Sequence, residues 1–214
     1  MNRFLRLWIA RVILLLAGLT VAHLGVTLFL LADLGSDPFN VLIQGLLRFI
    51  PWPPVVTHGA VHMAVSLLIV AVLLIVDRSY IRIGTLLCMV LGGPIIDLFS
   101  WLLRPLINGQ SPIVWRVACL ALGCVILAFG MTVVIKSQAG TGPNDLVALV
   151  ISEKGKWTFG VVRVIVDAAF AAGGFALGGT IGAGTVICAF LVGPTAQIFL
   201  PVSEKICNRF LPEK

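Results

Sequence analysis

Two short polar stretches hold most of the side chains in this sequence that could bind or transfer a charged group. The first runs from Leu34 to Val41 as LGSDPFNV, and the second runs from Ala139 to Leu146 as AGTGPNDL, 105 residues later. In both, a glycine, a small hydroxyl residue and a proline lead into an apolar run, which predicts a loop that enters a helix with proline in its first turn. Free backbone N–H groups at such a helix start, with carboxylate, amide and hydroxyl side chains beside them, can bind a small polar or ionic solute.

The candidate solute-binding residues lie at these two helix starts or just after a proline inside an apolar run. They are Gly35, Ser36, Asp37, Asn40, Asp97, Gly140, Thr141, Asn144, Asp145 and Gln197. Asp97 and Gln197 each follow a proline by three residues, and polar groups at that depth are costly unless they have partners. Helix N-termini favour anions, whereas the aspartates bring negative charge, so the sign of the solute charge stays open. A carboxylate or histidine in a low dielectric could also carry protons.

The composition is that of a polytopic membrane protein. Hydrophobic residues make up 59% of the 214 residues, charged residues make up only 11%, and the mean hydropathy is +1.10. The net charge of +6 comes from basic residues at the ends of apolar runs, where membrane topology accounts for them. No basic patch is interleaved with aromatic residues, which argues against nucleic-acid binding.

The sequence gives little support to metal, cofactor or enzyme chemistry. His58 and His62 have the spacing of two metal ligands on one helix face, but no third ligand is evident. The five cysteines match no zinc or redox spacing. Arg163 lies four residues before Asp167, which predicts an ion pair inside the bundle. Since no nucleophile–base pair or phosphate-binding loop is visible, we expect neither an enzyme nor a cofactor or metal site.

Six apolar runs are long enough to cross a bilayer, because each has about the 20 residues that a spanning helix requires. They cover residues 7–31, 57–76, 83–103, 112–135, 158–177 and 181–202. Two further apolar segments, 39–50 and 144–152, are short. At 1.5 Å per residue these would reach roughly 14 to 18 Å, well below the ~30 Å hydrocarbon thickness, so we expect that they do not span.

The second half of the chain repeats the first. The matches at an offset of 105 residues are Arg11, Gly18, Gly25, Gly35, Pro38 and Asn40 with Arg116, Gly123, Gly130, Gly140, Pro143 and Asp145. The offset is 101 at Thr57 and Gly59, and also at His62, so that His62 aligns with Arg163. From residue 81 to residue 99 the offset is 100. Glycine and proline fix backbone geometry, so matches of these types in one order indicate a duplication. We therefore divide the chain into a first repeat, 1–107, and a second repeat, 108–214.

Three crossings in each half is an odd number, which predicts that the two repeats lie in opposite orientations about an axis in the membrane plane. The charges agree: with the N-terminus in the cytoplasm, cytoplasmic segments hold the Arg and Lys residues at 3–6, 78–82, 136, 154–156 and 205–214. An alternative with eight crossings makes the halves parallel. It places Arg78, Arg82 and Lys136 outside and therefore fits the charge pattern less well.

In the inverted arrangement, each short helix begins near mid-depth and returns to the surface that it came from. Irregular backbone at that depth is tolerated only where it is buried in protein or lines a cavity. Two such helices, entering from opposite faces, would direct their N–H groups and positive dipole ends at one central locus. In the alternative interpretation both short helices lie flat in the interface, and the Gly and Pro residues only allow close helix packing.

The blocks GSDPFN at 35–40 and GTGPND at 140–145, with the paired blocks at 81–94 and 181–194, cover about the whole chain when taken together. In these motifs the sequence resembles the YczE/YyaS/YitT group of bacterial integral membrane proteins. The resemblance implies a multi-pass protein of the bacterial cytoplasmic (inner) membrane, in a group whose biochemical role is largely unassigned. The charge pattern places both termini in the cytoplasm.

We expect an all-α polytopic membrane protein of two inverted repeats, each with three spanning helices and one short re-entrant helix. The expected function is that of a secondary transporter or channel for a small polar or ionic solute, which binds where the two short helices meet. The alternative is a non-transporting scaffold or accessory subunit of another membrane or biosynthetic system. The expected partners are the lipid bilayer and the solute, and the sequence leaves a homo-oligomer open.

Overall fold

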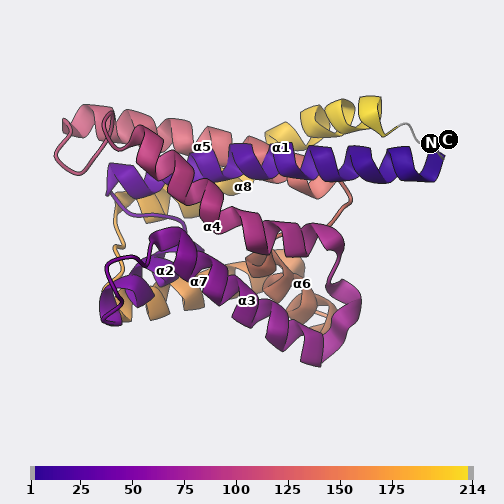
Figure 1. Ribbon diagram of the computed structural model, residues 1–214, viewed down its shortest axis with the longest axis horizontal. Helices are drawn as coiled ribbons and strands as arrows, with labels where there is room; N and C mark the ends of the chain where they lie inside the picture. Colours follow the sequence, from indigo (N-terminus) through magenta and orange to yellow (C-terminus); the bar gives the residue numbers. More distant parts are fainter. Residues whose placement is uncertain (1–2, 212–214) are drawn as a thin grey trace.

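Helices account for nearly all of the chain in the computed structural model, which describes the backbone of residues 3–211 and the side chains of 5–158, 161–188, 191–192 and 194–211 (Figure 1). In chain order the helices of this part are α1 (Arg3–Ala32), α2 (Pro38–Phe49), α3 (His58–Asp77), the 3-10 turn η1 (Arg78–Tyr80), α4 (Ile83–Leu103), α5 (Ile113–Lys136), α6 (Pro143–Gly155), α7 (Phe159–Ala176) and α8 (Ala183–Phe210). Both short helices are present, and each has proline in its first turn, as predicted.

Four helical segments in the described part of the chain are long and apolar enough to cross a membrane. They are Leu5–Ala32, His58–Tyr80, Ile83–Leu103 and Ile113–Lys136, which correspond to α1, α3 with η1, α4 and α5. Large apolar side chains are exposed along them: on α3, Leu68 is 63% exposed and Ile75 is 87% exposed. Apolar side chains on the outer face of an apolar helix are typical of contact with lipid. That α7 and α8 also cross the membrane stays a prediction from the sequence.

The long helices α1 and α5 lie along each other in antiparallel directions and form the most extensive helix contact (Figure 1). Glycines make this close approach. A Cβ atom added to Gly18 would lie 2.9 Å from the backbone oxygen of Gly130, and one added to Gly25 would lie 2.7 Å from that of Gly123. Small residues let helix backbones approach closely in membranes, where van der Waals packing replaces the hydrophobic effect as the force between helices.

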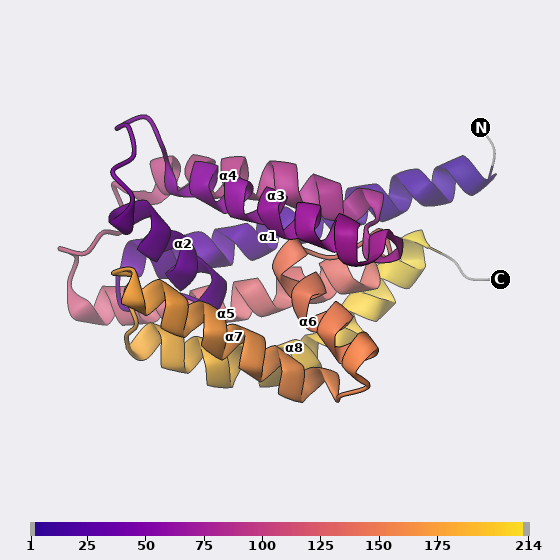
Figure 2. The same cartoon turned by 90° about the horizontal axis from the view of Figure 1, so that it is seen from below.

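Both short helices pack against α3 and α7 (Figure 2). Helix α2 lies against α7, and a Cβ added to Gly45 would come within 2.3 Å of the backbone oxygen of Gly174. Helix α6 contacts α3 and α7, and its Leu146 and Val150 pack on Leu73 of α3. The α2–α7 contact is therefore made backbone to backbone, whereas larger apolar side chains separate α6 from α3.

The loops that precede the two short helices have the same backbone path. Asp33 and Gln138, 105 residues apart, have φ angles of +50° and +58°. Gly35 and Gly140 follow them with φ angles of +106° and +146°, which glycine adopts without a Cβ clash.

Each of these loops is also tied to the start of a long helix by one main-chain hydrogen bond. The N–H of Gly184 in α8 donates to the carbonyl of Leu34 at 2.7 Å, and the N–H of Gly84 in α4 donates to the carbonyl of Ala139 at 3.1 Å.

Substitution of Gly25 by alanine tests the α1–α5 contact. The new Cβ would lie 2.5 Å from the backbone nitrogen of Leu127, so the helices must separate, and overpacking of this kind costs about 1–3 kcal/mol. We expect a lower midpoint of thermal unfolding in detergent. The matched control is Gly173→Ala on α7, where the new Cβ meets only Leu42 Cδ1 at 3.8 Å. An equal loss of stability in both variants would show that the close approach is not what matters.

Candidate functional site

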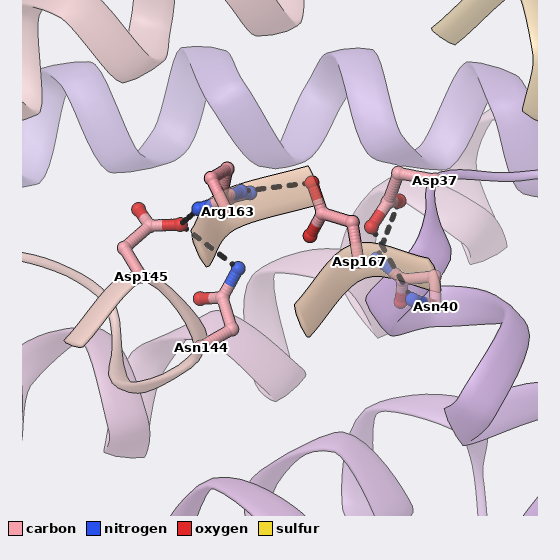
Figure 3. Close-up of polar contacts among 6 residues, drawn as sticks. All are labelled: Asp37, Asn40, Asn144, Asp145, Arg163 and Asp167. Atoms are coloured by element: carbon pink, nitrogen blue, oxygen red, sulfur yellow. Dashed lines mark hydrogen bonds and ion pairs between the residues drawn. The ribbon is translucent and has the colours of Figure 1, made fainter. Parts of the chain in front are cut away.

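The first polar cluster consists of Ser36, Asp37, Asn40 and His58, at the N-terminal ends of α2 and α3. Figure 3 shows Asp37 and Asn40 of this cluster. Asp37 is the N-cap of α2: its Oδ1 accepts the backbone N–H of Asn40 at 3.2 Å. Its Oδ2 accepts the Asn40 Nδ2 amide at 2.8 Å and the Ser36 hydroxyl at 3.3 Å. The Asp37 carboxylate therefore satisfies one of the free N–H groups of α2.

The donor in the hydrogen bond between His58 and Asn40 follows from the other hydrogen bond of the Asn40 side chain. The Asn40 amide nitrogen donates to Asp37, so its Oδ1 is the atom 2.8 Å from His58 Nε2, and a carbonyl oxygen can only accept. His58 Nε2 therefore carries the hydrogen, and a neutral His58 keeps its lone pair on Nδ1. A hydrogen-bonded chain thus runs from α3 through Asn40 to the Asp37 carboxylate.

The second polar cluster consists of Asn144, Asp145, Arg163 and Asp167, on α6 and α7 (Figure 3). Arg163 Nε donates to Asp167 Oδ2 at 2.9 Å, and Arg163 Nη1 pairs with Asp145 Oδ1. Asn144 Nδ2 donates to the same Asp145 oxygen at 3.1 Å. The three charged side chains are 24–30% exposed, so each lies mostly inside the bundle. In Figure 3, Asp167 is drawn between Arg163 and the Asp37–Asn40 pair.

The other candidate residues occupy different places. Gly35 and Gly140 shape the two loops through their positive φ angles. Thr141 has a buried hydroxyl without a hydrogen-bond partner. Asp97 stabilises the start of α3, because its carboxylate accepts the Thr57 hydroxyl at 2.5 Å and the Gly59 N–H at 2.9 Å. Gln197 is exposed on α8 and joins neither cluster.

Three residues of the two clusters were absent from the candidate set: His58, Arg163 and Asp167. The ion pair between Arg163 and Asp167 was predicted from their spacing and is confirmed. The sequence signal that could have moved Arg163 into the candidate set is its charge inside an apolar run, since an ionisable residue at membrane depth is costly and often functional. His58 was noted only for its spacing to His62, and no sequence pattern pointed to its partner Asn40, which is 18 residues away across a loop.

The charges of the two clusters favour a cation over an anion. When ionised, the three carboxylates of Asp37, Asp145 and Asp167 outnumber the one guanidinium of Arg163. The N-terminus of α2 already faces its own N-cap carboxylate, and the first turn of α6 holds Asp145. Both positive dipole ends are therefore occupied by carboxylates of the chain itself. Among the described residues, no three His, Cys, Asp or Glu side chains gather as a metal site would require.

Substitution of Arg163 by methionine tests the second cluster. The change leaves Asp145 and Asp167 without their shared counter-ion, and removal of one partner from a largely buried pair costs about 3 kcal/mol. We expect a clear fall in the midpoint of thermal unfolding. Lysine at 163 should give an intermediate value, because it keeps the charge but not the forked geometry.

The matched control for this test is Lys136→Met. Lys136 pairs with Glu204, whose side chain is 51% exposed, and such pairs contribute about 1 kcal/mol or less. Equal losses of stability from the two methionine variants would contradict a special role for Arg163.

The chain is similar to three curated bacterial proteins over most of its length. It is 30% identical to the uncharacterized membrane protein YczE of Bacillus subtilis over 193 residues. The aligned region covers 90% of this chain and 86% of that protein. It is 27% identical over 203 residues to an uncharacterized protein of Haemophilus influenzae, with 94% of this chain and 89% of that protein covered. It is 26% identical over 188 residues to the uncharacterized protein YyaS of Bacillus subtilis, with 88% of this chain and 91% of that protein covered. No solved structure matches.

These similarities confirm the resemblance predicted from the motifs, and they agree with several apolar helices of membrane-spanning length. The match to a family extends from residue 9 to residue 201, which is nearly the whole chain. The protein is therefore a multi-pass membrane protein with bacterial relatives, and it belongs to the family described as "Family of unknown function (DUF6198)".

Proposed function

We propose that this protein is a membrane transporter or channel that moves a small polar or ionic solute past the N-terminal ends of α2 and α6. The observation that carries the proposal is the pair of polar clusters, one at the start of each short helix, inside an otherwise apolar helical bundle (Figure 3). Charged groups in that setting mark solute or ion pathways, and paired short helices are the best pointer to a transporter site.

The proposal includes an inverted duplication, and matched contacts support it. In the α1–α5 contact, Gly18 meets Gly130 and Gly25 meets Gly123, so matched positions exchange partners across the interface. The arginines matched at an offset of 105 residues behave in the same way: Arg11 contacts Gln138, and Arg116 contacts Asp33. Reciprocal contacts between antiparallel helices are what a two-fold axis perpendicular to those helices produces.

The proposal also includes re-entrant short helices. Near the start of α2, Phe39 packs on Phe170 of α7, whereas Arg48 near the end of α2 donates to Gly178 and Thr180, beyond the end of α7. Helix α2 therefore runs toward the same end of the bundle as the end of α7.

Helix α6 follows the corresponding course in the other half. Near its start, Asp145 pairs with Arg163 of α7. Near its end, Lys154 pairs with Asp77, the last residue of α3, and Glu153 accepts a hydrogen bond from Tyr80 of η1. Both paths agree with helices that start at depth and return to one surface.

The proposed solute is a small cation, or a polar molecule that donates hydrogen bonds. The excess of carboxylates in the two clusters supports this choice, because an anion would meet three aspartates and one arginine. Both termini are proposed to lie in the cytoplasm, as the charge pattern favours.

The orientation is tested by single cysteines placed in the η1 turn and in the loop before α5. The five native cysteines are buried, so background labelling should be low. We expect Ser79→Cys to react with a membrane-impermeant maleimide in inverted vesicles but not in intact cells, and Asn108→Cys to show the reverse. Labelling of Ser79→Cys in intact cells would place this turn outside, as the eight-crossing alternative requires, and would rule out the inverted arrangement.

Transport is tested in proteoliposomes with a panel of ammonium, methylammonium, potassium, acetate and glycerol. We expect flux of at least one cation or neutral solute, which Asp37→Asn and Asp145→Asn each reduce at least about tenfold, since loss of one site charge removes about 1.4 kcal/mol or more of attraction. Asparagine is also a good N-cap, so Asp37→Asn should keep α2 intact.

The control for the flux assay is Glu204→Gln, which changes an exposed carboxylate outside both clusters. Flux no higher than in protein-free vesicles for every solute, with a stoichiometric partner that co-purifies, would replace transport with an accessory-subunit role.

A further inference from the structure

Five buried side-chain atoms in the described part of the chain have no hydrogen-bond partner. They are Arg11 Nε, His62 Nδ1, Ser66 Oγ, Thr85 Oγ1 and Thr141 Oγ1. Ser66 and Thr85 are fully buried, and His62 is 7% exposed. Buried polar groups are nearly always hydrogen-bonded, to protein or to ordered water, so a group of exceptions requires an explanation.

At each of these five positions, the matched residue in the other half makes a side-chain hydrogen bond. The matched residues are Arg116, Arg163, Asp167, Thr185 and Ser36, at the offsets of 105, 101 and 100 found in the sequence. Arg116 Nε donates to the carbonyl of Ala32, and Arg163 donates to Asp167. Thr185 Oγ1 accepts the N–H of Gly182, and Ser36 donates to Asp37. The unpaired atoms are therefore confined to one of two matched sets.

Three of the unpaired atoms follow one another along the facing surfaces of α3 and α4, and a fourth, Thr141 Oγ1, belongs to the loop before α6. His62 faces Gly92 of α4, since a Cβ added there would lie 3.0 Å from His62 Cε1. Ser66 is one helical turn further along α3, and Thr85 is about two turns back along α4 from Gly92, in the same direction because the helices are antiparallel. The Thr85 backbone adjoins Gly140, the residue before Thr141.

This row ends close to the two polar clusters. His62 stacks edge-on against Phe39, the neighbour of Asn40, with ring centroids 5.2 Å apart. At the other end, Thr141 precedes the first turn of α6, which carries Asp145. We call these four residues the hydroxyl row, although one of them contributes an imidazole: His62, Ser66, Thr85 and Thr141. The row thus extends from beside the first cluster to beside the second.

We propose that the hydroxyl row holds a file of ordered water molecules that conducts protons between the two clusters. This inference rests on the proposed function and identifies the proton as its coupling ion. Hydroxyl groups can both donate and accept, so each can pass a hydrogen-bonded chain of water onward. One proton enters at one end as another leaves at the other, so no bond changes in net terms.

A second imidazole adjoins the row at the level of Gly92. His23 Nδ1 lies 2.8 Å from the carbonyl of Leu19, so Nδ1 carries the hydrogen and the lone pair of a neutral His23 is on Nε2. A Cβ added to Gly92 would lie 2.9 Å from this Nε2, so both imidazoles face the same point of α4. The lone pair provides an acceptor for the water file.

The titratable and charged groups that surround the row come from five helices and the loop before α2. They are His23 of α1, Asp37 of that loop, His58 and His62 of α3, Asp97 of α4, Asp145 of α6, and Arg163 and Asp167 of α7.

Thr85→Val is the decisive variant, because valine has the shape of threonine without its hydroxyl group. Proteoliposomes that contain the pH dye pyranine are given a potassium gradient, and valinomycin then drives proton entry. We expect Thr85→Val to lower the proton flux at least tenfold while its unfolding midpoint stays unchanged or rises. Ser66→Ala should act in the same direction. A merely structural role of Thr85 predicts normal proton flux, and that result would overturn the proposal.

The matched control is Thr132→Val. Thr132 is also fully buried, but its hydroxyl donates to the carbonyl of Phe129 or bonds to Ser203, away from the row. We expect a lower unfolding midpoint and an unchanged proton flux in this variant.

A second readout needs no transport. Radiolytic hydroxyl-radical labelling modifies buried side chains that lie beside ordered water, so His62 should be labelled strongly in the native protein and weakly in Thr85→Val. Weak labelling in the native protein would contradict the water file. Solute flux without proton flux would leave the proposed function intact and remove this inference. Proton flux without flux of any other solute would support the water file and contradict the proposed transport of a second solute.

Discussion

The fold depends on one constraint: backbone polar groups inside a membrane must find partners within the protein. The loops before α2 and α6 are irregular and carry positive φ angles, so they cannot satisfy their own backbone groups as a helix does. Their carbonyls at Leu34 and Ala139 instead accept main-chain hydrogen bonds from the first turns of α8 and α4. Each short helix is therefore positioned by a long helix that is distant in the chain: α4 begins 60 residues before α6, and α8 begins 145 residues after α2.

Within that common backbone plan the two halves differ in how they satisfy polar side chains. The half that contains α7 pairs a guanidinium with two carboxylates, whereas the matched positions on α3 hold a histidine and a serine whose Nδ1 and Oγ atoms have no partner. The packing differs too, since Gly45 lets α2 touch the α7 backbone while Leu146 and Val150 keep α6 apart from α3. The polar positions on α7 are thus paired within the chain, whereas the matched positions on α3 keep buried polar atoms without a partner in it.

Much of the architecture could be predicted from the sequence because glycine and proline report backbone geometry directly. The helices expected at 39–50 and 144–152 were found at Pro38–Phe49 and Pro143–Gly155, and the glycines matched at an offset of 105 residues lie in the α1–α5 contact. The ion pair on α7 followed from a spacing of one helical turn.

The polar contacts between elements could not be predicted in this way. Asn40 with His58 and Asp145 with Arg163 join residues across a loop, where no periodicity sets the distance. Repeat matching also failed to distinguish Asp97, which stabilises the start of α3, from the exposed Gln197. The unpaired atoms of the hydroxyl row have no sequence signature at all, because absence of a partner is a property of the assembled bundle.

The glycine contact between α1 and α5 has a consequence for the order of assembly. A ribosome releases α1 first, yet the helix against which it packs most extensively begins at Ile113, after α2, α3 and α4 have been made. Until then the glycine face of α1 has only lipid or other early helices beside it. The first half of the chain therefore lacks the most extensive contact of α1 until α5 is made, so the complete bundle forms only after more than half of the chain has been synthesised.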